Sequence, residues 1–70
     1  MKKFSVIIAG QHITSISLEE EFYSELCKIA KELKLSPNKL ITEIDKNRTT
    51  TNLSSAIRLY ILKTLQDKIN

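Results

Sequence analysis

The pattern of apolar and polar positions divides the chain into two extended segments followed by three stretches with helical spacing. Residues 4–9 are apolar at every position except Ser5 and rich in β-branched side chains, which is typical of a strand covered on both faces. Residues 13–18 alternate instead, so successive side chains point to opposite faces of a strand. The spacing predicts a core-facing set of Thr14, Ile16 and Leu18. It leaves a mostly polar outward set of Ile13, Ser15 and Ser17.

The strand at residues 13–18 has no obvious polar–apolar partner elsewhere in the chain. We therefore expect it to pair with a copy of itself from a second subunit. The spacing leaves open whether residues 4–9 fold back on it as a hairpin or continue as a bent extension. Gly10, the only glycine, predicts a turn or a positive φ between the two segments.

Three helices are predicted after the strands. The first covers about residues 19–34, with glutamates in its first turn and lysines near its end, as the helix dipole favours. The second runs from Pro37 to residue 45 or 46, with Ser36 as its N-cap. After a polar loop, a third helix follows at about residues 53–68, capped by Asn52 or Ser54. Its apolar stripe is wider than a surface helix needs, which indicates contact with more than one neighbour.

Length predicts one small domain over residues 1–70. The pattern of strands and helices divides it into an N-terminal apolar segment at 1–12, a core motif of one strand and two helices at 13–46, and an extra helix at 53–69. A chain this short buries only about 60% of its unfolded surface. The single cysteine excludes an internal disulfide, so association is the expected source of extra core. The apolar run near the N-terminus is too short for a signal peptide or an anchor, and we expect a soluble cytoplasmic protein without membrane contact.

Candidate catalytic chemistry is sparse. The chain has one histidine, His12, and one cysteine, with no glycine-rich phosphate loop and no paired carboxylates placed to raise a pKa. We therefore predict no enzyme activity, no cofactor and no metal. The net charge of +3 permits contact with a phosphate backbone but is common in other soluble domains.

The order of strand, amphipathic helix, tight turn and capped second helix resembles the ribbon-helix-helix family of DNA-binding proteins. The likeness covers residues 13–46. It extends to a subgroup through Ala-Gly-Gln-His-Ile-Thr-Ser-Ile-Ser-Leu-Glu at residues 9–19 and Asn-Leu-Ser-Ser-Ala-Ile-Arg-Leu at residues 52–59. The resemblance implies a mainly α fold with a short N-terminal β-ribbon and a third C-terminal helix. It also implies an intertwined homodimer whose ribbon, formed between chains, enters the major groove of duplex DNA.

The resemblance also implies the site residues. The outward strand side chains would contact base edges, here Ile13, Ser15 and Ser17. Backbone N–H groups at the start of the second helix would hold a phosphate, here around Ser36, Pro37, Asn38 and Lys39. Serine hydroxyls serve donor or acceptor edges, so their base readout is permissive.

One departure from the family pattern favours a second function. The related subgroup commonly has arginine where this chain has Ile13, and isoleucine contacts a thymine methyl but gives no hydrogen bond to guanine. Together with the apolar segment at residues 4–9, this suggests that protein covers the outer side of the ribbon. The first hypothesis is a homodimeric DNA-binding transcriptional regulator. The alternative is an oligomeric interaction or adaptor module, including antitoxin-like binding of a protein partner to the third helix.

Overall fold

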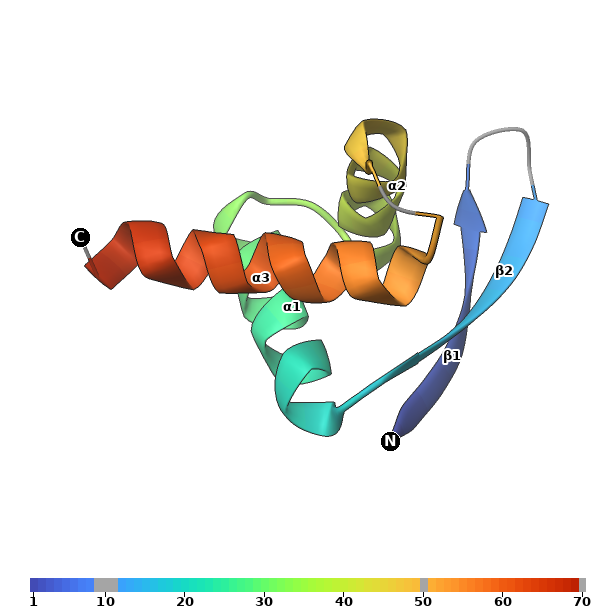
Figure 1. The fold of residues 1–70 in the computed structure, drawn as a ribbon, viewed down its shortest axis with the longest axis horizontal. Coiled ribbons are helices and arrows are strands. Elements are labelled where there is room, and N and C mark those ends of the chain that lie inside the picture. Colours follow the sequence, from blue (N-terminus) through green and yellow to red (C-terminus); the bar gives the residue numbers. More distant parts are fainter. Residues whose placement is uncertain (9–11, 50, 70) are drawn as a thin grey trace.

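The computed structural model describes residues 1–8, 12–49 and 51–69, and within them a hairpin of two strands packs on three helices (Figure 1). The elements in chain order are β1 (Lys2–Ile8), β2 (His12–Leu18), α1 (Glu20–Glu32), α2 (Pro37–Asn47) and α3 (Leu53–Ile69). The predicted order of elements and the predicted class, mainly α with a short N-terminal ribbon and a third helix, are confirmed.

The ribbon in this structure is formed within one chain. β1 and β2 pair antiparallel over their whole length, from Lys2 opposite Leu18 to Ile8 opposite His12. Of the two arrangements left open for the apolar N-terminal segment, the hairpin is the one observed, and the pairing of β2 with a copy of itself stays a prediction. Gly10 lies outside the described residues, and so does the turn predicted for it.

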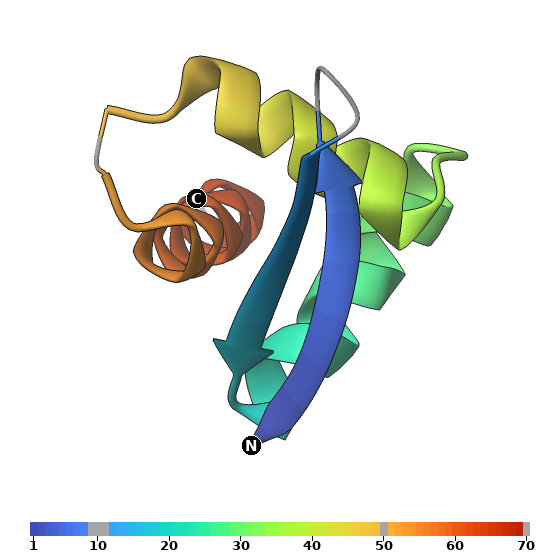
Figure 2. The ribbon, with the colours of Figure 1, turned by 90° about the vertical axis from the view of Figure 1, so that its right-hand side faces the viewer.

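The hairpin lays one face on the helices and leaves the other face open (Figure 2). The inward side chains are Phe4, Val6 and Ile8 from β1 and Thr14, Ile16 and Leu18 from β2, all buried or half-buried. The prediction for β2 is confirmed. Within a single chain only one face of β1 is covered, since Ser5 and Ile7 are exposed, and covering of the other face by a second chain stays a prediction. A continuous apolar run indicates a two-sided strand, but an antiparallel hairpin at the surface needs only one apolar face.

A single core joins the hairpin to all three helices. Its fully enclosed large side chains come from one strand and each helix in turn: Leu18, Leu26, Ile41, Ile57 and Ile61. The stripe of α3 is wide, as predicted. One part of it enters this core, whereas Leu59, Leu62 and Ile69 remain exposed.

Local capping fixes where the helices begin and end. Ser36 caps α2, as predicted, because its Oγ accepts the N–H of Lys39 at 3.1 Å. Asn52 caps α3 by accepting the N–H of Ser55 at 3.1 Å. α1 ends at Glu32, Lys34 follows with a left-handed φ of 60°, and Leu35 N–H then donates back to the carbonyl of Ala30 at 2.8 Å.

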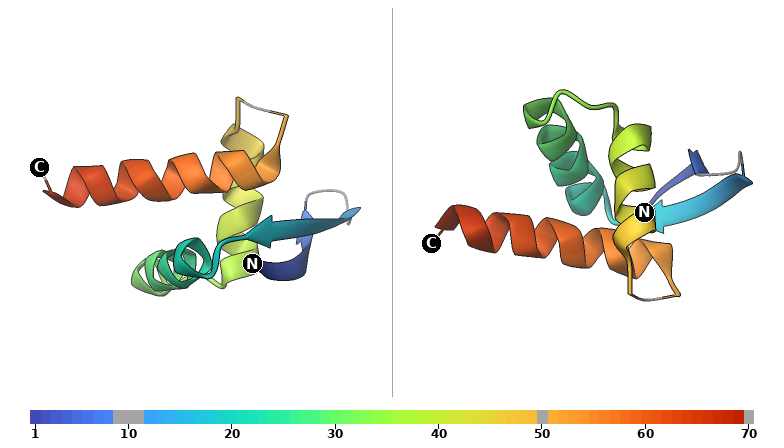
Figure 3. Two further views of the ribbon diagram at one scale, coloured as in Figure 1. Left: turned by 60° about the horizontal axis from the view of Figure 1, so that its bottom comes forward. Right: turned by 90° about the horizontal axis from the view of Figure 1, so that it is seen from above.

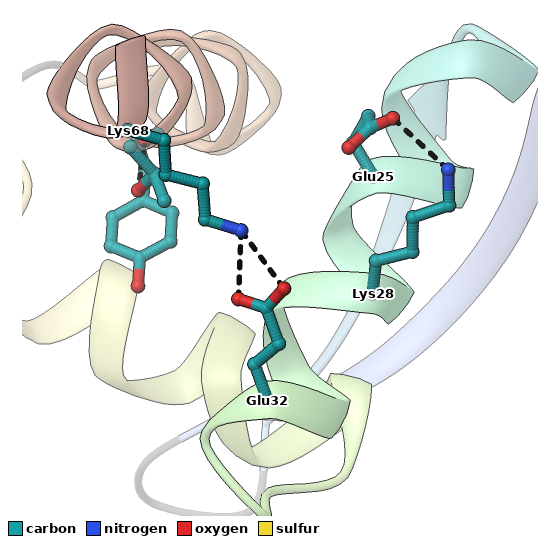
Figure 4. A network of polar contacts seen from close by, with 6 residues as sticks. Glu25, Lys28, Glu32 and Lys68 are labelled. Atoms are coloured by element: carbon teal, nitrogen blue, oxygen red, sulfur yellow. Dashed lines mark hydrogen bonds and ion pairs between the residues drawn. The ribbon is translucent and has the colours of Figure 1, made fainter. Parts of the chain in front are cut away.

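Two ion pairs tie α3 to the two ends of α1. Lys68 contacts both carboxylate oxygens of Glu32, at 2.9 and 2.8 Å, near the ends of both helices (Figure 4). Arg58 contacts Glu19, which immediately precedes α1. α3 is thereby held along α1, and its C-terminal end extends away from the hairpin (Figure 3).

Candidate nucleic-acid interface

The open face of the hairpin is a small, mostly polar surface contributed by both strands. Directly opposite residues on an antiparallel pair point to the same side of the sheet. Three such pairs make up this outward face: Lys3 with Ser17, Ser5 with Ser15, and Ile7 with Ile13. The expected base-contacting residues of β2 thus lie together here, with Ser15 exposed and Ser17 half-buried. Sequence reasoning missed the β1 half of this face, because it left the pairing of the N-terminal segment open.

The start of α2 is fastened to the outer edge of β1. Asn38 Nδ2 donates to the carbonyl of Ile7 at 2.9 Å, and Ile7 N–H donates to Asn38 Oδ1 at 2.9 Å. Thr42 Oγ1 also donates to the carbonyls of Ile7, at 3.3 Å, and of Asn38, at 2.9 Å. The side-chain amide of Asn38 therefore takes the place of a neighbouring strand at this point, and it holds the N-terminal end of α2 beside the ribbon.

The Asn38 contact also shows which backbone groups face the open edge of β2. Because Ile7 directs both its N–H and its C=O away from β2, Ile7 and Ile13 form a non-hydrogen-bonded pair. Such pairs alternate along an antiparallel ladder, so Ser15 and Ser17 likewise direct their backbone groups away from β1. Within the described ranges, no hydrogen bond reaches this outer edge of β2. One edge of the hairpin is therefore closed by α2, whereas the outer edge of β2 has no such hydrogen-bonded partner among the described residues.

The donors at the start of α2 are few. Pro37 has no N–H, and the N–H of Lys39 is used by the Ser36 cap. The Asn38 side chain is engaged with Ile7. The groups left to bind a phosphate at this helix end are the Asn38 N–H and the exposed Lys39 side chain. Lys39 makes no ion pair in the part of the chain described. Of the expected phosphate-contacting residues, Ser36 already has a complete structural role as a cap.

In the described part of the chain, apolar side chains reach the surface on the outward face of the hairpin and in a groove beside α3. Ile7 and Ile13 form an exposed cross-strand pair on the outward face, with 55% and 73% of their surface accessible. A separate open groove of about 610 Å³ lies between α2, α3 and the turn after α1. Its apolar lining includes Leu33, Leu35, Leu40, Ile44, Leu59 and Tyr60. Both surfaces are candidates for contact with another chain.

Arg58 has a structural partner within its own chain. Its Nε lies 2.8 Å from Glu19 Oε1, and one terminal nitrogen lies 3.3 Å from Glu19 Oε2. This two-point hydrogen bond to Arg58 lowers the pKa of the Glu19 carboxyl below its ordinary value. Arg58 therefore has a structural role in joining α3 to the start of α1, and the planar guanidinium fork, which can bind both oxygens of one carboxylate, explains why arginine suits this position.

Among the residues that the structure describes, no three His, Cys, Asp or Glu side chains gather where a metal ion would bind. No described helix is both long enough and apolar enough to cross a membrane.

Comparison with known proteins gives one match. Residues 1–65 match the family model described as a ribbon-helix-helix domain. No curated protein and no solved structure matches the chain. Proteins with this domain are generally DNA-binding transcription regulators or antitoxins, and they generally form dimers.

Proposed function

The chain belongs to the ribbon-helix-helix family, and from this premise we propose that it is a homodimeric cytoplasmic regulator of transcription that binds duplex DNA through the open face of its hairpin. The observation that carries the proposal is the arrangement around β1 and β2. A polar outward face lies open, one edge is free, and the start of α2 is held at the other edge by Asn38.

The free edge of β2 is the proposed dimer contact. An unpaired row of backbone N–H and C=O groups is a template for a strand from another chain. Antiparallel pairing of two β2 strands through the backbones of Ile13, Ser15 and Ser17 gives a four-stranded sheet with the β2 strands at its centre. The second copy also adds the core that so short a chain lacks.

The base contacts are assigned to the centre of that sheet. The hydroxyls of Ser15 and Ser17 hydrogen-bond to base edges, and Ile13 contacts a thymine methyl. At the flank, the Asn38 N–H, the positive end of the α2 dipole and the Lys39 ammonium bind a phosphate. Asn38 thus contributes its backbone to DNA and its side chain to the hairpin.

Binding of the full chain to labelled duplex DNA tests this function. Fluorescence anisotropy is measured on a random-sequence duplex pool and on a duplex selected from that pool by the wild-type protein. We expect affinity to fall steeply with salt, because phosphate contacts release counterions. Replacing Ser15 and Ser17 together by alanine weakens binding to the selected duplex by about 1–3 kcal/mol but leaves the random pool nearly unaffected. A wild-type protein that binds no duplex at low salt contradicts the proposal.

The exposed pair of Ile7 and Ile13 supports a second candidate function, an oligomeric adaptor whose ribbon face is covered by protein. In that case the pair is buried on assembly, and the apolar groove beside α3 accepts a protein partner, as in an antitoxin. Multi-angle light scattering separates the two functions. Tetramers or larger species that dissociate on Ile7→Ser with Ile13→Ser favour the adaptor, whereas a dimer that is stable at high concentration favours the DNA-binding function.

A further inference from the structure

We propose that Lys3 contacts a DNA phosphate at the wall of the major groove, which makes β1 a backbone-contacting strand beside the base-contacting β2. The inference rests on the proposed function, because it requires the hairpin to lie in the groove. The family resemblance assigns DNA contacts to β2 and to the start of α2, so Lys3 adds a binding residue on a different element, β1.

The register of the hairpin places Lys3 on the outward face. Lys3 lies directly opposite Ser17, so both side chains leave the same side of the sheet. Its neighbour Lys2 belongs to the opposite face, where its ammonium lies 5.4 Å from the centre of the Tyr23 ring. Lys3 is exposed and, in the part of the chain described, makes no ion pair. It is the one charged member of the three outward pairs.

The width of the proposed dimer sheet determines what Lys3 meets. Neighbouring strands lie about 4.8 Å apart, so the two outer β1 strands of a four-stranded sheet lie about 14 Å apart. The major groove is about 12 Å wide and admits a two-stranded ribbon. The two β2 strands therefore fit between the groove walls, while each β1 strand meets a wall. The walls are phosphate backbone, which a lysine ammonium binds as a point charge.

A second cation lies on the same flank of the hairpin. Ile7, where Asn38 fixes the start of α2, is four residues from Lys3 along β1, a distance of about 13 Å in a strand. The β1 flank thus carries Lys3 at one end and the α2 terminus with Lys39 at the other. This row of positive charge follows one edge of the ribbon, as a phosphate strand would.

Two neighbouring lysines provide a matched test, because Lys3→Gln and Lys2→Gln remove the same charge from opposite faces of one strand. Each full-length variant is titrated against the random-sequence duplex pool over a series of KCl concentrations. We expect Lys3→Gln to flatten the slope of log K against log salt by about 1.8 for the dimer, because each of its two chains loses one phosphate contact. Lys2→Gln changes the slope much less, and Lys3→Arg retains the wild-type slope. Circular dichroism confirms that each variant is folded.

Three results overturn the inference. The first is an unchanged slope for Lys3→Gln when the wild type binds, and the second is equal flattening by Lys2→Gln. The third is a loss confined to duplexes with one particular base pair, which assigns Lys3 to a base instead of a phosphate. Failure of the wild type to bind any duplex overturns the proposed function as well, so the two failures are distinguishable.

Discussion

Asn38 and Ile7 are joined by two reciprocal hydrogen bonds of 2.9 Å, in which a side-chain amide pairs with a strand backbone as another strand would. This contact links residues that are 31 positions apart. It closes one edge of the hairpin, leaves the other edge for a second chain, and places the N-terminal end of α2 at the margin of the proposed DNA-binding face.

Asn38→Asp tests the contribution of this link to stability. Aspartate keeps an acceptor for the Ile7 N–H but loses the donor to the Ile7 carbonyl and brings a negative oxygen toward it. We expect the free energy of unfolding in urea to fall by about 1–2 kcal/mol. Thr42→Val, which removes the longer bond to the same carbonyl and the local bond to the Asn38 carbonyl, should cost less. Equal stability of Asn38→Asp and wild type would show that the hairpin does not depend on this contact.

Proline substitutions test which edge of the hairpin forms the dimer. Ser15 and Ser5 lie opposite each other, and both direct their N–H groups away from the other strand. Ser15→Pro removes a donor from the open β2 edge, and Ser5→Pro removes one from the β1 edge, without loss of a bond within the hairpin. Sedimentation equilibrium should show a dimer weakened by at least tenfold for Ser15→Pro and nearly unchanged for Ser5→Pro. The reverse order would place the dimer contact at β1.

Lys34→Gly should stabilise the protein. Lys34 adopts a φ of 60° where α1 ends, a conformation that costs a residue with a side chain about 1 kcal/mol relative to glycine. Its side chain has no ion pair among the described residues, so little is lost on its removal. Thermal and urea unfolding should both show a gain, reduced somewhat by the greater freedom of glycine in the unfolded chain. A destabilised variant would mean that the lysine side chain itself supports the turn.

The Glu19–Arg58 pair predicts one component of acid sensitivity. The hydrogen bond to Arg58 lowers the pKa of Glu19 in the folded state below the ordinary value of 4.5. The pair therefore adds stability above that value, and the contribution is lost as pH falls through the lowered pKa. Solvent reaches this half-exposed pair, so the effect is modest. Melting temperatures from neutral to acidic pH should decline less for Arg58→Gln than for wild type. Parallel declines would exclude the pair as a source of acid sensitivity.

The sequence predicted those features that depend on local patterns. The three helices, the Ser36 cap and the inward set on β2 follow from periodicity and capping chemistry, and all are observed. The pairing of β1 with β2 did not follow, because an apolar run such as residues 4–9 has no alternation to indicate its partner or its open face.

The non-local part of the candidate site was also beyond sequence reasoning. Nothing in the residues around Asn38 shows that its amide reaches a strand 31 positions away. Once the register is known, however, strand geometry alone places Lys3 on the outward face and Lys2 on the opposite face. The outward face then carries a positive charge that β2 by itself lacks.

An NMR titration of the ¹⁵N-labelled chain with duplex DNA, followed through its backbone amide signals, tests most directly whether the open face of the hairpin binds DNA. We expect the largest shifts at Ser15, Ser17 and Asn38, while the C-terminal turns of α3 around Lys68 remain unchanged. Shifts confined to α3 and its groove, or no shifts at low salt, would contradict binding of DNA by this face.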